Sequence, residues 1–261
     1  PLVIEQLLVI LVGFCDTIMV SSVGEAAVSA VSLVDSINVL LINVFAALGT
    51  GGAVVAAQFI GQGSLEKARF SAKQLLLITA ILSLIIMGVI LLFNTSILHL
   101  AFGNVDSGVM NNAETFFLVS ALSYPFIALY NSGAALFRAI GNSKISMITS
   151  AIMNVINIIF NTIFIFGLKL GVLGSGLATL IARMVCYIVI LKCLTNKDNN
   201  LYVDDYRHWK FDLVYIKKIL TIGIPSGLEN GMFQFGKILV QSLVATFGTY
   251  AIAANEIGRA H

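Results

Sequence analysis

The sequence predicts an all-α integral membrane protein: a six-helix bundle followed by the start of a second, repeated bundle. Of its 261 residues, 58% are hydrophobic and only 11% are charged, whereas a soluble domain is about 45–50% apolar and about 25% charged. The apolar residues gather in segments long enough to cross a bilayer. These segments lack the period-two alternation of membrane β-strands, so helices are the expected spanning elements.

Seven segments contain the roughly 20 apolar residues that a helix needs to cross a hydrocarbon core of about 30 Å. They are predicted at residues 2–20, 27–48 (with a continuation to 59 left open), 72–93, 116–137, 145–166, 173–194 and 219–244. An eighth is expected to begin near residue 251. On this division, residues 1–194 form the six-helix bundle, 195–218 a cytoplasmic linker, and 219–261 the first helix and the start of the next helix of a truncated second bundle.

Basic residues between the predicted spans indicate the orientation. Eleven of the 15 Lys and Arg residues follow even-numbered spans, whereas the loops after spans 1, 3 and 5 contain only Lys169. Lys and Arg are enriched in cytoplasmic loops. We therefore expect a multi-pass protein of a bacterial plasma (inner) membrane with its N-terminus in the cytoplasm.

Composition also excludes several classes of protein. The three cysteines, Cys15, Cys186 and Cys193, lie in apolar segments without ligand spacing, which argues against a disulfide framework and against a zinc site. No basic run is interleaved with aromatic residues, so nucleic acid is not an expected partner. No nucleotide-binding phosphate loop is present, so ATP-driven pumping is unsupported. We expect a monomer without a cofactor, whose partners are the lipid bilayer and small amphipathic organic molecules.

The chain contains a weak internal repeat. A shift of 224 residues aligns Pro1 with Pro225, Glu5 with Glu229, and four further identical Val, Gly or Ala residues in one ungapped register. A duplication implies a longer polypeptide of about 450 residues with two parallel six-helix halves, and transporters built in this way bind substrate between the halves.

Several motifs together resemble the multidrug and toxic compound extrusion (MATE) family of transporters. Pro1 with Glu5, GFCDTIMV at 13–20 and GEAAVSAV at 24–31 are similar to helix 1 and the start of helix 2 in that family. The cytoplasmic end of helix 2, the loop between helices 4 and 5, and the opening of helix 7 are matched by residues 49–61, 138–142 and 222–226. The resemblance implies twelve helices in two bundles around a V-shaped cavity. It also implies export of amphipathic, often cationic compounds, driven by a proton or sodium gradient.

A carboxylate inside the membrane costs about 2.5–3.5 kcal/mol or more and marks function by default. Asp16 lies about four residues from the outer end of the first predicted helix. Asn154, Asn157 and Asn161 share one stripe of the fifth helix, and Thr179 lies at a similar depth on the sixth. Such a group can bind a proton or supply oxygen ligands to a small hard cation, although we expect Asn154 to serve packing.

The resemblance points to the same residues. In archaeal family members, a helix 1 aspartate, a helix 5 asparagine and aspartate, and a helix 6 threonine form the amino-terminal cation site. These positions match Asp16, Asn157, Asn161 and Thr179, with an amide at Asn161 where the family has a second carboxylate. That departure leaves open whether H+ or Na+ is the coupling ion. Pro1 matches the proline beside which helix 1 of the family is proposed to bend.

Two more charges lie at equal depth in the predicted membrane region. Asp35 is on the second helix and Arg183 on the sixth, and we expect them to form a structural ion pair that offsets their desolvation. The alternative is that Asp35 faces the cavity and attracts cationic compounds. The sequence does not indicate a role for Glu229 or Lys237.

The sequence thus favours secondary active, cation-coupled multidrug export. A lipid-linked oligosaccharide flippase of the same superfamily remains an alternative, although it should have several basic residues facing the cavity, and only Arg183 and Lys237 are candidates. An intramembrane enzyme would need paired aspartates or a His-Glu-x-x-His helix, and the sequence contains neither. A seven-span receptor would not explain the repeat.

Overall fold

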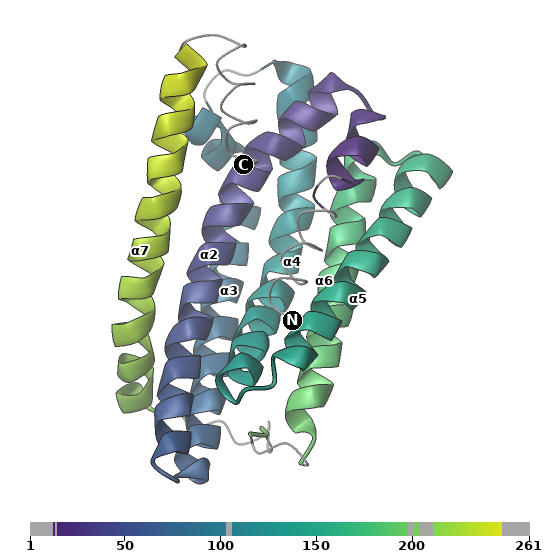
Figure 1. Cartoon of the computed structure of the whole chain (residues 1–261). Helices are drawn as coiled ribbons and strands as arrows, with labels where there is room; N and C mark the ends of the chain where they lie inside the picture. Colours follow the sequence, from purple (N-terminus) through teal and green to yellow (C-terminus); the bar gives the residue numbers. More distant parts are fainter. Residues whose placement is uncertain (1–12, 14, 103–105, 198–200, 204–210, 247–261) are drawn as a thin grey trace.

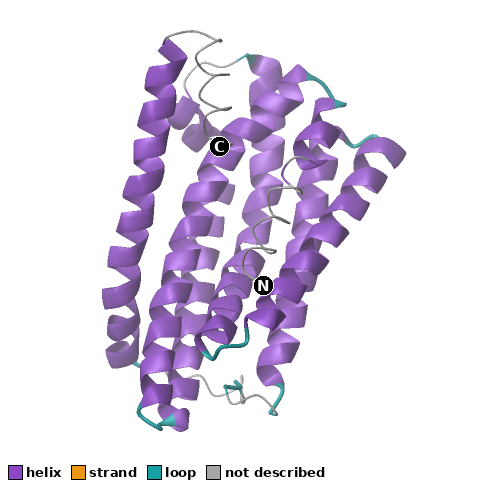
Figure 2. Ribbon diagram, viewed as in Figure 1, coloured by secondary structure: helices purple, strands orange, loops and turns teal. Residues whose placement is uncertain are grey.

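The computed structural model describes residues 13, 15–102, 106–197, 201–203 and 211–246. Within these ranges the chain is a bundle of long helices without a β-strand, as Figures 1 and 2 show. The predicted all-α membrane fold is therefore confirmed. Pro1, Glu5 and the expected start of an eighth helix lie outside the described residues.

The helices α2, α3, α4, α6 and α7 are longer than the apolar segments that predicted them, as is α5 when η1 is counted with it. Residues 15–20 belong to the end of the first helix. The other elements are α2 (Glu25–Gly61), α3 (Leu65–Phe102), α4 (Ser107–Ala139), α5 (Ser143–Asn161), the π-helix η1 (Thr162–Gly167), α6 (Gly171–Thr195) and α7 (Leu213–Thr246). Among the described residues, five spans, with α5 and η1 counted together, are long and apolar enough to cross a membrane. The helices continue beyond the apolar runs because backbone hydrogen bonding does not stop where the hydrocarbon ends.

Tight glycine turns make successive helices antiparallel. Gly63 and Gly141 end α2 and α4 with φ values of +72° and +81°, a left-handed conformation that glycine adopts at little cost. The N–H of Ser64 then donates to Phe59 O over 2.9 Å, and the N–H of Asn142 donates to Phe137 O over the same distance. These bonds satisfy carbonyl groups that would otherwise lack partners at a helix end.

The core of the bundle lies around α4, which packs against α2, α3, α5 and α6. Its inward side chains include the fully buried Phe117, Tyr124 and Phe137. By contrast, Leu92 and Leu100 on α3 are 79% and 91% exposed. An exposed apolar face of this kind is unfavourable in water but suits a helix that faces lipid.

The first helix of the second predicted bundle is docked on α2. A Cβ atom added to Gly51 would lie only 2.5 Å from Ile219 O and 2.8 Å from Gly223 N, so the two backbones approach as closely as small residues permit. Figure 1 shows α7 running beside α2 along much of its length. The sequence predicts the start of this helix at residue 219, whereas α7 begins at Leu213, within the predicted linker.

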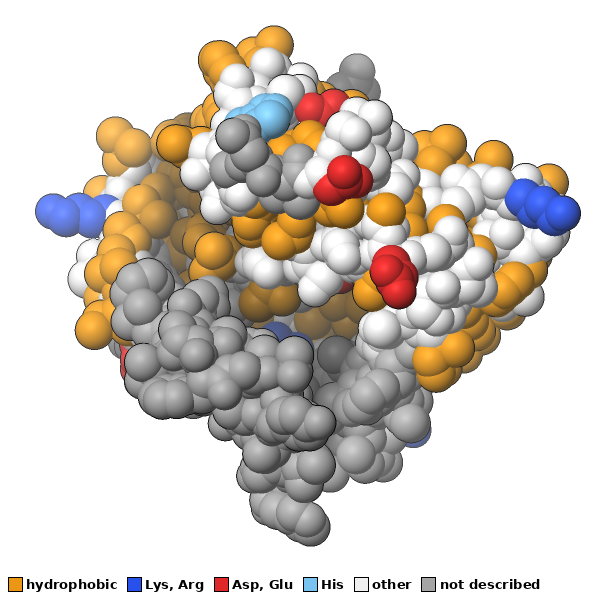
Figure 3. All heavy atoms as spheres, turned by 90° about the horizontal axis from the view of Figure 1, so that it is seen from above, with side chains coloured by type: hydrophobic (Ala, Val, Ile, Leu, Met, Phe, Trp, Pro, Cys, Tyr) orange, Lys and Arg blue, Asp and Glu red, His pale blue; other side chains and the backbone are white. Residues whose placement is uncertain are grey.

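The two ends of the bundle differ in charge. The connections α2–α3 and α4–α5, the end of α6 and the start of α7 lie together at the lower end in Figure 1. They contain those basic residues of the predicted orientation that the structure describes. Figure 3 looks onto the opposite end, which exposes acidic side chains and is hollowed near its centre. Glu25 and Asp106, at the starts of α2 and α4, are exposed there. This end corresponds to the predicted outer side.

Candidate functional site

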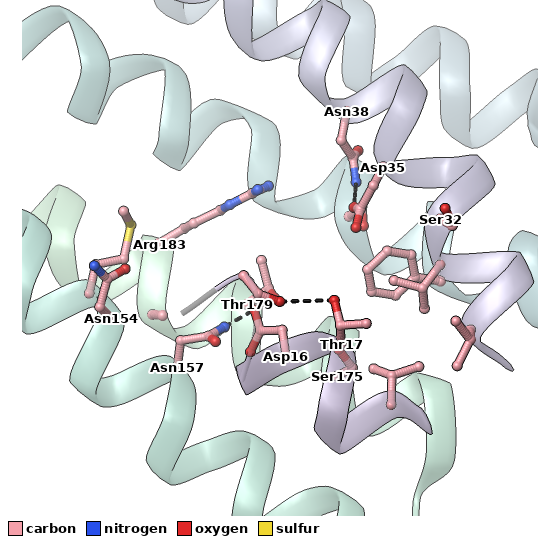
Figure 4. Close-up of a pocket in the computed structure, with 18 residues that line it drawn as sticks. Asp16, Thr17, Ser32, Asp35, Asn38, Asn154, Asn157, Ser175, Thr179 and Arg183 are labelled. Carbon is pink, nitrogen blue, oxygen red and sulfur yellow. Dashed lines mark hydrogen bonds between the residues drawn. The ribbon is translucent and has the colours of Figure 1, made fainter. Parts of the chain in front are cut away.

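A cavity of about 360 Å³ lies between the first helix, α2, α4, α5 and α6 (Figure 4). Its apolar wall includes Val20, Val28, Val31, Phe116 and Met153. Its polar lining consists of Asp16, Thr17, Ser32, Asp35, Asn38, Ser120, Asn154, Asn157, Ser175, Thr179 and Arg183. The volume is within the range of about 300–1,000 Å³ that is typical of small-molecule sites.

The structure brings the four predicted cation-site residues together. Nδ2 of Asn161 donates to Asp16 Oδ1 over 2.7 Å and to Asn157 Oδ1 over 3.1 Å. Nδ2 of Asn157 lies 3.2 Å from Thr179 Oγ1. A hydrogen-bonded chain therefore connects the first helix, α5 and α6, and Figure 4 shows Asp16, Asn157 and Thr179 converging at one side of the cavity.

The α5 residues of this cluster are buried, whereas Asp16 is accessible from the cavity. Asn161 is fully buried and Asn157 is 6% exposed, whereas Asp16 is half-buried and lines the cavity. When the Asn157 amide is turned over, its Nδ2 lies 2.8 Å from Asp16 Oδ1 and its Oδ1 can accept from Thr179 Oγ1 over 3.2 Å. Two amide donors can therefore approach the Asp16 carboxylate.

One oxygen of the cluster has no partner. Oδ1 of Asn161 is buried and accepts no hydrogen bond in the described part of the chain. A buried acceptor without a donor costs about 1–3 kcal/mol. After rotation of the amide toward Asp16, this oxygen would accept from a protonated carboxyl group or contribute an oxygen ligand to a cation.

The helix geometry changes directly after Asn161. α5 ends there and the chain continues as the π-helix η1, in which the N–H of Leu168 donates to Ile163 O over 2.9 Å. π-Helical turns are rare and occur frequently at functional sites. Gly174 of α6 allows close approach here, because a Cβ at this position would lie 3.0 Å from Phe164 Cβ. The sequence TIFIFG reads as ordinary helix, so nothing in it predicted the widened turn.

Asp35 and Arg183 both line the cavity, but they do not form the direct ion pair that the sequence predicts. Asp35 Oδ1 accepts from Asn38 Nδ2 over 3.0 Å, and Asn38 Oδ1 accepts from the Tyr124 hydroxyl over 2.6 Å. Arg183 Nη1 instead donates to Ser123 Oγ over 2.6 Å. Each charge has a hydrogen-bond partner on α2 or α4, and the Asp35 side chain is among those that line the cavity.

Sequence reasoning missed the partners of these two charges. Asn38 lies one turn after Asp35 on α2, a spacing that predicts contact between polar side chains. Tyr124 and Ser123 belong to α4, and no short-range signal connects them with α2 or α6. Figure 4 shows Asp35 and Asn38 on one wall and Arg183 reaching across the cavity from another.

The remaining predicted residues have less definite places. Asn154 is 7% exposed and lines the cavity, and its Nδ2 has no partner among the described residues. Glu229 is exposed on α7. The proposed bend at Pro1 and the side chain of Lys237 lie outside the described part of the molecule.

A family model, MatE, matches residues 1–163 of the chain. The uncharacterized transporter YisQ of Bacillus subtilis is 29% identical over 260 residues, which are 98% of this chain and 56% of YisQ. The multidrug export protein MepA of Staphylococcus haemolyticus is 28% identical over 258 residues, with the same two coverages. The chain therefore spans about half the length of the curated relatives that it matches.

Solved structures give the same result. A MOP superfamily transporter from Pyrococcus furiosus is similar with a TM-score of 0.87 and 26% identity, over 96% of this chain and 55% of that one. A MATE structure in the bent conformation gives a TM-score of 0.86 with 25% identity, over 96% of this chain and 56% of that one. The relatives of this chain are membrane transporters and not enzymes. Because the family model matches more than half of the chain, the chain belongs to the MatE (multidrug and toxic compound extrusion) family.

Proposed function

We propose that this chain forms the amino-terminal half of a multidrug exporter. The full protein would exchange H+ or Na+ for amphipathic, often cationic organic compounds across a bacterial plasma membrane. Relatives named as multidrug export proteins support the activity, and the coverage of about half of each relative supports the assignment to one half. The observation that carries the proposal is the Asp16–Asn161 contact at the wall of the cavity.

Asp16 is the proposed coupling group, because its charge has no fixed counter-ion. Among the described residues, its hydrogen-bond partner is an amide and no Lys or Arg forms a salt bridge with it. A carboxylate held by neutral donors inside a membrane is stabilised when a cation binds. Binding and release of H+ or Na+ would therefore change the local free energy far more here than at a carboxylate already paired with Arg.

Asn161 is proposed to respond to cation binding at Asp16 by rotation of its side-chain amide. Its Nδ2 donates to the charged carboxylate, but a protonated carboxyl group needs an acceptor, which the unpartnered Asn161 Oδ1 would become after the amide rotates. The same oxygen would join Asp16 and a hydroxyl or amide oxygen around a sodium ion, since small hard cations prefer oxygen ligands. Rotation of one buried amide would thus transmit cation binding to α5 and, through Asn157 and Thr179, to α6.

The cavity is proposed to bind the organic compound. Its apolar wall suits a hydrophobic body, and the Asp35 carboxylate supplies a negative charge for an ammonium group. A flippase for lipid-linked oligosaccharides would need several basic side chains to hold a pyrophosphate. Within the described residues, Arg183 is the one Lys or Arg that lines the cavity, so the exporter is favoured.

The test is dye efflux from cells that express the full-length protein, with the proton and sodium gradients collapsed separately. We expect efflux to stop when one gradient is collapsed, and Asp16→Asn to reduce efflux by at least about 100-fold while the protein stays folded, because this amide cannot exchange a cation. Ser21→Ala, at the end of the same helix and outside the cavity, is the control, since Ser21 is exposed and its Oγ donates to Ile18 O. Efflux insensitive to both gradients, or normal efflux by Asp16→Asn, would refute the proposal.

A further inference from the structure

A second hollow lies near the basic end of the bundle, where α2 ends and α7 begins. This groove, which we name the α2–α7 groove, has a volume of about 670 Å³. It is lined by Val55, Gln58, Phe59, Gln62, Val214, Lys217, Lys218, Thr221 and Ile222. None of these residues lines the Asp16 cavity, and Figure 1 shows the lower ends of α2 and α7 side by side.

Specific contacts hold the walls of the groove in place. The Tyr215 ring lies 5.6 Å from the Phe59 ring and 4.9 Å from the Phe70 ring, measured between centroids. The backbone N–H of Asp212 donates to Gln74 Oε1 of α3 over 3.1 Å. The first turn of α7 is therefore anchored to α2 and α3, so the groove has defined walls before any ligand arrives.

The charge of the groove is positive. Lys217 and Lys218 line it and are exposed, and Lys218 Nζ lies 5.3 Å from the centroid of the Phe59 ring. Among the described residues, no Asp or Glu lines the groove and neither lysine forms a salt bridge. Within the described ranges, the two ammonium groups are thus left to face the groove without a carboxylate partner.

The rest of the lining is both apolar and hydrogen-bonding. Val55, Val214 and Ile222 form apolar wall, and Val214 is 63% exposed. Gln58, Gln62 and Thr221 are exposed polar residues close to the lysines along the helix ends. An anionic head with acceptor oxygens and a hydrocarbon body would be complementary to both parts of this surface.

We propose that the α2–α7 groove binds an anionic phospholipid, with its phosphate at Lys217 and Lys218 and an acyl chain along the apolar wall. The basic end of the bundle is the predicted cytoplasmic side, and the cytoplasmic leaflet is anionic. Basic pockets between membrane helices on that side bind lipid head groups of this chemistry. Because the groove is shared by α2 and α7, a bound lipid would connect the first predicted bundle with the second.

Lipid binding to the purified full-length protein tests this site, by native mass spectrometry and by titration with phosphatidylglycerol or phosphatidylcholine. We expect phosphatidylglycerol to bind more tightly than phosphatidylcholine, and the double variant Lys217→Gln/Lys218→Gln to weaken its binding roughly 10- to 30-fold. Lys217→Arg/Lys218→Arg should retain binding, because both charges remain. The control Lys67→Gln/Lys144→Gln removes two basic residues at the same end but outside the groove, and it should bind like the wild type.

Four results would overturn the proposal. The first is equal affinity for the two lipids, and the second is an equal loss of binding in the control variant. The third is displacement of phosphatidylglycerol by millimolar glycerol phosphate, because the groove would then be a site for soluble phosphate compounds. Binding by the Gln variant at wild-type strength would likewise exclude the lysines as ligands.

Discussion

The Asp16 cluster and the contact between α2 and α7 differ in what holds their helices together. Around Asp16, three helices meet through a carboxylate, two amides and a hydroxyl, and one buried oxygen has no partner. At the junction, α2 and α7 meet through Gly51 and Gly223 with almost no space between their backbones. Polar groups with alternative partners allow rearrangement, whereas close backbone packing permits few arrangements. The comparison indicates where the bundle can change state and where it holds together.

The junction should be the more sensitive region for stability. Gly51→Leu would force a side chain into Ile219 O and Gly223 N, which a Cβ alone would approach to 2.5 and 2.8 Å. Overpacking of this kind costs about 1–3 kcal/mol and occasionally more. We expect a marked loss of folded protein, measured by size-exclusion chromatography and thermal unfolding in detergent. Gly88→Leu is the matched control, because nothing lies within 4 Å of a Cβ at Gly88; comparable losses in both variants would contradict the close-packing argument.

The two carboxylates of the cavity should have different functions, with Asp16 in ion coupling and Asp35 in recognition of cationic substrates. Asp35→Asn is expected to raise KM for a cationic dye by about 10-fold, equivalent to about 1.4 kcal/mol, because it removes the negative charge proposed to face the ammonium group. Efflux of an uncharged substrate and the dependence on the ion gradient should persist. The measurement is transport by the full-length protein in vesicles, with Asp106→Asn as a control at the N-cap of α4, outside the cavity. An equal change in KM for both substrates would refute a charge-recognition role.

A smaller effect is expected for the hydrogen bond that holds Asn38. Tyr124→Phe removes the hydroxyl that donates to Asn38 Oδ1 over 2.6 Å and should lower the free energy of unfolding by about 1 kcal/mol. Tyr187→Phe is the control, because it keeps the ring contact of Tyr187 with Phe126. Thermal unfolding of the two variants side by side would show whether the Tyr124 hydroxyl matters; equal stabilities would show that it does not.

Much of the fold could be predicted from the sequence, because membrane spans depend on local composition. The apolar runs predicted α2 to α6 with their central residues correctly placed, and the spacing of Asn157 and Asn161 placed both on one face of α5. Helix ends were predicted less well. Lys217 and Lys218 suggested a polar linker, whereas they lie within the first turns of α7, since long basic side chains at a membrane interface are compatible with helix.

The features that escaped prediction depend on contacts between distant parts of the chain. The Tyr124–Asn38 bond joins residues 86 positions apart, and the Arg183–Ser123 bond joins residues 60 positions apart. The π-helix after Asn161 has no sequence signal, because its residues are ordinary helix and strand formers. The sequence can thus identify the charged and polar side chains that lie inside the membrane. Their hydrogen-bond partners depend on how the helices pack.

The central claim is that Asp16 binds a cation and releases it when substrate binds. The most direct measurement is the release of H+ or Na+ by the purified full-length protein when a transported cation is added in detergent, followed with a pH indicator and a sodium electrode. We expect release of about one cation per protein from the Asp16 site, because one carboxylate can be neutralised by one charge. The Asp16→Asn variant should still bind the substrate, but it should release about one cation per protein fewer than the wild type. Undiminished release from Asp16→Asn would contradict the account.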